Sequence, residues 1–304
     1  LSATRGEIYD AGMNKLASNY TVYRIFISPR DIENDEQAEL ISKGLSDILG
    51  VDRDRIRTLT KKVHRADETV MKKASDEQAD AVRKFILDNG LTMQIHLEAG
   101  TARYYPFSSL AANVIGVAGT DGGLTGLEYQ YNSFLLGESS KDAQGGQMPS
   151  KYDTYIDASN GANLVTTIDV TIQKALEKQL KQSYLDSEPM NRITGIVMDV
   201  NTGAVLAMAT YPTFDLNSPF TLDEDSVKKL EESGFAPDSK EYASYQTELL
   251  YKLWRNKAVS ELYEPGSTFK ILTAASALDS GVVSVGEGFY CSGSTHVDGS
   301  RVRC

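Results

Sequence analysis

Ser267 and Lys270 are the two residues of this sequence whose types and spacing best suit nucleophilic chemistry. On a helix, positions three apart lie on one face, so the lysine amine would come up beside the serine hydroxyl. A serine hydroxyl attacks well only when a base takes its proton, and a lysine can act as that base only while uncharged. Its surroundings must therefore desolvate the amine. The pair predicts a serine nucleophile with a lysine base.

The residues around this pair predict a buried helix. Pro265-Gly266 forms a turn signal, and the almost uncharged run 269–278 has helical composition and ends at Gly281. Such a helix is expected to be buried, so that its lysine cannot simply point into water. Backbone N–H groups at the helix start could also stabilise a developing oxyanion.

A second Ser-x-x-Lys occurs at Ser226 and Lys229, which shows that two fixed residues alone are a weak signal. This copy lies in a run of acidic and basic residues, 223–232, that is typical of a solvated helix. We assign it no function.

The segment Tyr263-Glu264-Pro265-Gly266-Ser267-Thr268-Phe269-Lys270 resembles the active-site motif of the class B penicillin-binding proteins. These are the monofunctional transpeptidases that crosslink bacterial peptidoglycan. The resemblance implies Ser267 as the acylated nucleophile and Lys270 as its proton acceptor. It also implies peptidoglycan stem peptides as substrates, a terminal D-alanine as leaving group, and β-lactams as acylating substrate mimics.

Two further segments are similar to the non-catalytic pedestal of this family. They are Arg5-Gly6-Glu7-Ile8-Tyr9-Asp10 and Gly123-Leu124-Thr125-Gly126-Leu127-Glu128. We expect Glu128 to brace the pedestal by pairing with a buried basic group such as Arg5 or Arg103, a structural role.

Two other motifs of the family do not occur in the sequence. No Ser-x-Asn follows Lys270, no Lys-Thr-Gly occurs anywhere, and the sequence ends at Cys304. We therefore expect these residues to be the first part of a longer enzyme and to be impaired on their own.

Composition limits the class of protein. The 304 residues are 41% hydrophobic and 24% charged, which is typical of about two globular domains. A net charge of −11 argues against a nucleic-acid partner. No apolar run approaches the roughly 18 residues of a membrane helix. The resemblance implies a single N-terminal membrane anchor outside this sequence and an extracytoplasmic body.

The predicted fold class is α+β, with a pedestal domain over 1–160 and the first part of a penicillin-binding/transpeptidase (serine β-lactamase-like) domain over 161–304. A Gly- and Ser-rich stretch, 137–161, predicts the linker. In the pedestal we expect a strand at 20–28, a helix at 35–49 ending at Gly50, a helix opened by a capping box at 75–78, and a strand at 93–97.

In the second domain, helices are expected to pack on an antiparallel sheet. We expect a strand at 164–168, a helix at 170–184, a hairpin of 193–200 and 204–209 around Asn201-Thr202-Gly203, and a charged helical insertion at 223–257. The Ser267 helix would sit against that sheet.

Cys291, His296, Asp298 and Cys304 predict a structural zinc site near the end of the sequence. Asp298-Gly299 is a hairpin signal that would bring the two cysteines together, and on a strand His296 and Asp298 would share a face. A disulfide between the cysteines is the next hypothesis, worth roughly 3 kcal/mol, and free thiols are a third.

The alternatives for the function are a serine β-lactamase or β-lactam sensor of the same superfamily, and a non-catalytic scaffold. The long pedestal-like half argues against a compact β-lactamase. A scaffold would dock partners such as a membrane glycan polymerase.

Overall fold

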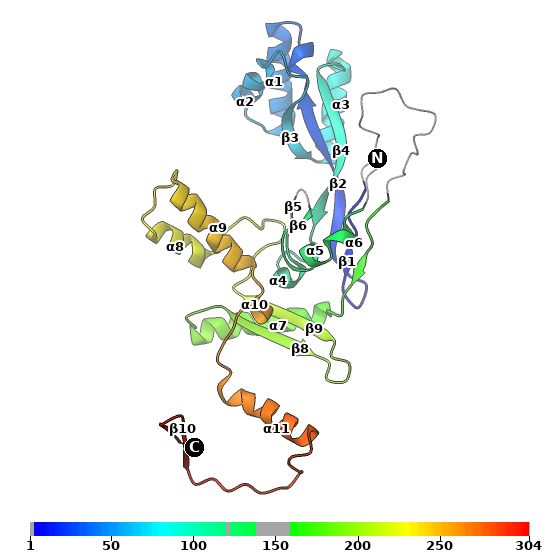
Figure 1. Cartoon of the computed structure of the whole chain (residues 1–304). Coiled ribbons are helices and arrows are strands. Elements are labelled where there is room, and N and C mark those ends of the chain that lie inside the picture. The colour runs from blue at the N-terminus through cyan, green and yellow to red at the C-terminus, as the bar shows by residue number, and fades with distance from the viewer. Residues whose placement is uncertain (1–2, 120–121, 138–158, 304) are drawn as a thin grey trace, which may run out of the picture. The chain divides into compact units, whose positions relative to one another are not determined.

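A computed structural model describes residues 3–119, 122–137 and 159–303. The chain forms two compact units, Leu1–Ser260 and Glu261–Cys304 (Figure 1). The linker expected at 137–161 lies almost wholly outside the described residues. The domain limit after residue 160 falls within the first unit and stays a prediction.

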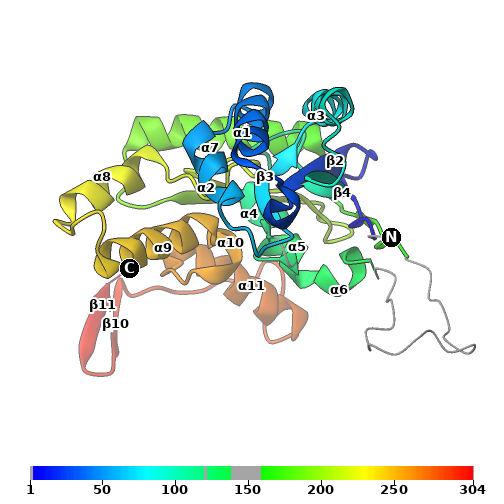
Figure 2. The ribbon, with the colours of Figure 1, turned by 90° about the horizontal axis from the view of Figure 1, so that it is seen from above.

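The upper part of the first unit is organised around the long strand β2 (Lys15–Ile27). β4 (Ile95–Tyr104) pairs antiparallel along it from Ser18 to Ile27, and β3 (Glu68–Ala74) pairs antiparallel on its other side. Figure 2 shows α1 and α3 beside these strands. The helices here are α1 (Asp35–Leu49), α2 (Arg53–Thr60) and α3 (Asp76–Asn89), with a 3₁₀ turn at Pro29–Asp31.

Helix boundaries in this part follow the signals in the sequence. α1 ends at Leu49 and Gly50 adopts φ 67°, as predicted. The capping box is also confirmed, because Ser75 and Gln78 exchange both of its hydrogen bonds at the start of α3. All three helices bury aliphatic side chains against the sheet, including Ile41, Ile56 and Val82. α2 was not predicted, because its apolar residues are outnumbered by charged ones.

The base of the first unit is built from short elements of both sequence halves. β1 (Ile8–Tyr9) pairs antiparallel with β2 and parallel with β7 (Leu164–Val165). The other elements are β5 (Ala118–Gly119), β6 (Gly122–Gly123), α4 (Ala112–Ile115), α5 (Gly126–Gln130) and α6 (Asn132–Leu135). After β7 come α7 (Val170–Ser187), β8 (Ile193–Met198), β9 (Val205–Tyr211), α8 (Glu224–Glu232), α9 (Lys240–Trp254) and α10 (Lys257–Ser260).

One hydrophobic core joins these elements across the predicted domain limit. Ile8 and Ile115 from the first part pack in the same cluster as Val170, Phe214 and Trp254. The pedestal and the segment up to Trp254 therefore share one continuous core.

α7 packs on the β8–β9 hairpin, as the sequence predicted for a helix on an antiparallel sheet. The buried Gln173 side chain fixes this contact. Its amide donates to the Met208 carbonyl oxygen (3.0 Å) and accepts from the Met208 N–H (2.9 Å). The Asp169 N–H also donates to the Leu206 carbonyl oxygen at 2.9 Å. Backbone groups on the outer edge of β9 are thus paired by residues 169–173.

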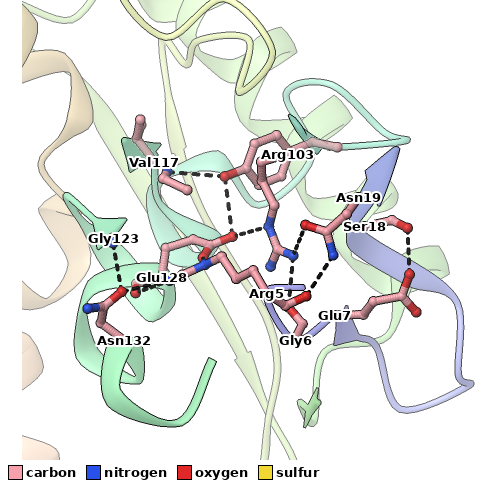
Figure 3. A network of polar contacts seen from close by, with 12 residues as sticks. Arg5, Gly6, Glu7, Ser18, Asn19, Arg103, Val117, Gly123, Glu128 and Asn132 are labelled. Atoms are coloured by element: carbon pink, nitrogen blue, oxygen red, sulfur yellow. Dashed lines mark hydrogen bonds and ion pairs between the residues drawn. The ribbon is translucent and has the colours of Figure 1, made fainter. Parts of the chain in front are cut away.

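Glu128 lies at the centre of a buried polar cluster, with none of its surface exposed (Figure 3). Arg5 donates from Nε to Oε2 of Glu128, and Arg103 donates from Nε to Oε1, both at 2.7 Å. The Tyr105 hydroxyl donates to Oε1 at 3.3 Å, and Arg5 Nη1 donates to Asn132 at 2.8 Å. The expected pairing of Glu128 with a basic group is confirmed, with both arginines in place of one.

This cluster joins three remote parts of the chain. Arg103 lies at the end of β4, and its Nη1 also donates to the Gly6 carbonyl oxygen (2.8 Å) and to Asn19 (3.2 Å). The arginine side chains are only 12% and 8% exposed, so both charges depend on the single carboxylate for compensation. Removing one partner of such a buried pair is strongly destabilising, because the other charge stays desolvated.

Glu128→Gln should lower the free energy of unfolding by about 3–5 kcal/mol, because two buried guanidinium groups lose their counter-charge. Urea denaturation of the 304-residue chain measures this. The matched control is Glu248→Gln, which breaks an ion pair with Lys252 whose side chains are 57% and 58% exposed. That change should cost about 0–1 kcal/mol. Equal losses in the two variants would contradict a special role for the buried cluster.

A second carboxylate, Glu7, is held by polar neighbours on β1 and β2. Burial raises the pKa of Glu7, but hydrogen bonds from Lys15, Ser18 and Tyr9 outweigh it and lower the pKa to about 2. A carboxyl group whose pKa is lower in the folded state stabilises the fold above its ordinary pKa of 4.5. This contribution is lost as the pH falls from there towards 2.

Glu7→Gln should flatten the loss of stability between about pH 4.5 and pH 2, because the amide does not titrate. Urea unfolding at a series of pH values tests this, with Glu33→Gln as a control at an exposed acidic side chain. An unchanged acid slope in Glu7→Gln would show that this carboxylate does not contribute.

No helix among residues 3–119, 122–137 and 159–303 has both the length and the apolar character needed to cross a bilayer.

Candidate active site

The second unit carries the predicted nucleophile and base. It contains a 3₁₀ turn, Gly266–Thr268, followed by helix α11 (Phe269–Asp279) and the hairpin of β10 (Ser294–Val297) and β11 (Ser300–Arg303). Ser267 lies in the turn, and Lys270 lies in the first turn of α11. The two residues are therefore one helical turn apart on a continuous segment, as predicted.

The local sequence explains this geometry. Gly266 has φ 56°, a left-handed conformation that glycine adopts without steric cost, and it follows Pro265 at φ −70°. The Thr268 N–H then donates to the Pro265 carbonyl oxygen at 3.3 Å. α11 ends at Asp279, and Gly281 adopts φ 70°, which confirms the predicted end of the helix.

Within the second unit taken by itself, this helix does not have the expected burial, so its burial stays a prediction. No residue of α11 is buried, and Ile271 and Leu272 are 73% and 60% exposed. A single helix cannot cover its own apolar side chains, and residues 261–303 of the second unit bury none of them. Ser267 and Lys270 are likewise exposed, and neither side chain is hydrogen-bonded to any residue that the structure describes.

The arrangement places the two functional groups without completing the contact between them. Catalytic hydrogen bonds are often formed only when substrate is bound, so the missing bond does not disqualify the pair. The second Ser-x-x-Lys, Ser226 and Lys229, lies in α8, where only Leu230 is buried. This confirms its prediction as a solvated helix.

The hairpin predicted before Cys304 is present. Val297 pairs with Ser300, and Asp298 and Gly299 form a two-residue turn at φ 49° and 79°, as expected for type I′. Asp298 is therefore in the turn and does not share a strand face with His296, contrary to the expectation. His296 pairs directly with Arg301 instead.

The zinc hypothesis stays a prediction, because Cys304 lies outside the described residues. Among the residues that are described, no group of three or more His, Cys, Asp or Glu side chains is arranged to hold a metal. Cys291, His296 and Asp298 belong to this end of the chain, and Cys291 is exposed.

Metal analysis of protein purified without added zinc should find about one zinc per chain if the four residues form a structural site. His296→Ala should then lower the zinc content and release titratable thiols. A disulfide between Cys291 and Cys304 would instead be indifferent to His296→Ala. No zinc and no titratable thiols would rule out the metal.

Comparison with protein families gives two matches. The model described as "Penicillin-binding Protein dimerisation domain" matches residues 1–166, and the model described as "Penicillin binding protein transpeptidase domain" matches residues 193–304. Ser267 and Lys270 fall within the second match, and Glu128 falls within the first.

Curated proteins similar to this chain carry related names. Stage V sporulation protein D of Bacillus subtilis is 32% identical over 99% of this chain and 42% of its own length. Penicillin-binding protein PbpB of Mycolicibacterium smegmatis is 27% identical over 99% of this chain and 46% of its own length. Peptidoglycan D,D-transpeptidase FtsI of Escherichia coli is 24% identical over 93% of this chain and 44% of its own length.

Two solved structures share the fold over the whole chain. Penicillin Binding Protein 2X from Streptococcus thermophilus has a TM-score of 0.65 at 22% identity, with 44% of its chain covered. A complex between Penicillin-Binding Protein (PBP2) and MreC from Helicobacter pylori has a TM-score of 0.64 at 20% identity, with 56% of that chain covered. The chain thus spans about half the length, or less, of the proteins it matches.

Proposed function

The chain belongs to the class B penicillin-binding proteins, and from this premise we propose that it carries the nucleophile of a peptidoglycan D,D-transpeptidase. The observation that supports this most directly is the position of Ser267 and Lys270. They lie one turn apart at the start of α11, after a Pro-Gly turn, within the segment matched by the transpeptidase family.

The proposed reaction has two acyl transfers. Ser267 Oγ attacks the carbonyl carbon of the penultimate residue of a stem peptide, and Lys270 Nζ takes the hydroxyl proton. The bond to the terminal D-alanine breaks, and the proton passes to its leaving amine. An amine of a neighbouring stem then attacks the ester, which forms the crosslink and returns the serine hydroxyl. β-Lactams would acylate Ser267 in the same way.

Fluorescent penicillin should form a covalent adduct with the protein expressed from its full gene, and Ser267→Ala should abolish the adduct. Ser226→Ala provides a matched control, because it removes the serine of the other Ser-x-x-Lys and should leave labelling unchanged. Gel fluorescence and intact mass measure both. Labelling that survives Ser267→Ala would overturn the assignment.

Lys270→Met should slow acylation by about 10²–10⁴-fold, because the serine loses its proton acceptor. The control is Lys229→Met in α8, which should retain the normal rate. Labelling reactions quenched at a series of times, at several penicillin concentrations, separate the acylation rate constant from the binding affinity. Equal rates in the two variants would assign the base elsewhere.

The product of the reaction separates the transpeptidase from its alternatives. A β-lactamase would release hydrolysed penicillin rapidly, whereas the transpeptidase should hold the adduct and form crosslinked stem peptides. The pedestal match over residues 1–166 favours the transpeptidase. A protein that never reacts with penicillin would leave only the scaffold role.

Location and partners are part of the same proposal. We place the protein at the outer face of the cell membrane, held by an anchor outside this sequence. One structural relative is described as a complex between PBP2 and MreC, which supports protein partners for this chain. A membrane glycan polymerase is the partner that would supply the strands to be crosslinked.

A further inference from the structure

A groove of about 1160 Å³ lies in the first unit between α9 and the segment that carries α4 and α5. Ser244, Thr247 and Tyr251 of α9 form one wall, and residues 125–127 form the other. The C-terminal end of α9 approaches α4 (Figure 1). Pockets for drug-sized ligands measure about 300–1,000 Å³, so this groove has room for a longer ligand.

The floor of the groove is held rigidly. The buried Asn113 side chain in α4 donates from Nδ2 to the carbonyl oxygens of Leu253 (2.9 Å), Trp254 (3.2 Å) and Arg255 (3.2 Å). These are carbonyl groups at the end of α9 that lack helical partners. Trp254 is 6% exposed, and its Nε1 donates to the Pro219 carbonyl oxygen at 2.7 Å. The groove is therefore largely formed before any ligand binds.

An aromatic ring is displayed in this groove. Tyr251 is 59% exposed, although large aromatic side chains are usually buried for the apolar area they contribute. The buried Trp254 ring holds it edge-on, with the ring centroids 5.7 Å apart and the planes at 88°. The Tyr251 ring is thus positioned by the core while its surface is left accessible.

Polar groups with unused hydrogen-bonding capacity surround this ring. The hydroxyls of Ser244, Tyr251 and Ser260 have no partner among the described residues, and neither does the Arg255 guanidinium. A hydroxyl can both donate and accept, so these groups suit a ligand rich in hydroxyl and amide groups.

The charge of the groove is unusual for this protein. The whole chain has a net charge of −11, but the charged residues that line the groove are Glu248, Lys252 and Arg255. Glu248 and Lys252 neutralise each other at 2.7 Å. Arg255 therefore leaves one positive charge, which favours a neutral ligand or one that carries an isolated carboxylate.

We propose that this groove binds the glycan strand of peptidoglycan. The C–H face of an amino-sugar ring packs on Tyr251, while the hydroxyl and acetamido groups bond to Ser244 and Ser260. Arg255 faces a carboxylate of the attached peptide. The choice of ligand rests on the proposed transpeptidase function, but the site lies in the first unit and makes no use of Ser267 or Lys270.

A helical protein segment fits the groove less well. Such a ligand needs a row of apolar anchors and an apolar floor to receive them. On the α9 wall, Tyr251 is the large exposed ring, and it is flanked by Ala243, Ser244, Thr247 and Glu248 in place of a row of apolar anchors. Apolar side chains such as Leu127 and Val259 also line the groove, and this mixture of apolar surface and hydroxyl groups suits a sugar chain, which has apolar ring faces and polar edges.

The single tryptophan of the chain provides a direct readout, because Trp254 contacts Tyr251. Tryptophan fluorescence of the 304-residue chain should change saturably on titration with a β-1,4-linked tetramer of N-acetylglucosamine. Tyr251→Ala should weaken this binding by about tenfold or more. Tyr20→Ala is the matched control, since Tyr20 is 49% exposed and pairs edge-on with Tyr104 outside the groove. It should bind the tetramer normally.

A second variant keeps the test valid if Tyr251→Ala does not fold. Ser244→Glu puts a bulky acidic group on the exposed α9 wall and should also abolish tetramer binding, with an unchanged urea midpoint. No saturable signal in the unmodified chain, or normal binding in both groove variants, would overturn the proposal. A response to a sugar-free stem peptide but not to the tetramer would overturn it too, and would identify a peptide groove.

The outcome is separable from that of the proposed function. Penicillin labelling at Ser267 with no tetramer binding would overturn the glycan site and leave the proposed transpeptidase function standing. Tetramer binding without penicillin labelling would sink the transpeptidase assignment and leave a wall-binding protein.

Discussion

The buried carboxylate of Glu128 is the interaction on which the rest of the first unit depends. It compensates two arginines from positions 5 and 103, which reach it from the beginning of the chain and from the end of β4. A charge in this position cannot be exchanged for water contacts, because none of the Glu128 surface is exposed. The three segments must therefore be assembled together or not at all.

Buried contacts connect this cluster, through α5 and α4, to the groove beside α9. Glu128 belongs to α5, which packs beside α4, and Asn113 of α4 binds the end of α9. The positions of α9 and of its displayed tyrosine are thus set through a series of buried polar contacts. A hydrophobic core alone would allow helices to slide, whereas directional hydrogen bonds to carbonyl groups fix their register.

Much of this fold could be predicted from local patterns in the sequence. The stripe of apolar residues in 35–49, the capping box at Ser75, and the turn at 201–203 each specify their element through short-range physics. The Glu128 pairing was accessible because a glutamate and two arginines occur in segments that resemble the pedestal. Asn113 and Gln173 gave no signal, because a buried amide looks like any exposed amide until its distant partners are known.

The candidate site shows what local sequence patterns cannot predict. The turn at Gly266 and the helix that follows are local features and were predicted, but the burial of that helix depends on other elements that must cover it. The face of Asp298 was also misjudged, because a residue in a tight turn no longer follows the alternation of a strand. Composition indicates that a side chain needs cover, and it does not say which segment provides it.

The contacts of Gln173 have a consequence for how the β8–β9 sheet can grow. Its amide occupies the Met208 backbone groups, so the outer edge of β9 is already sealed there against another strand. The outward N–H and C=O groups of β8, in contrast, are not matched by any described residue, and Ile196 and Met198 beside them are about half exposed. The two edges of this sheet are therefore not equivalent, and a third strand can join it only along β8. Extended segments of the same molecule or of a neighbouring one would compete to pair with this open edge of β8.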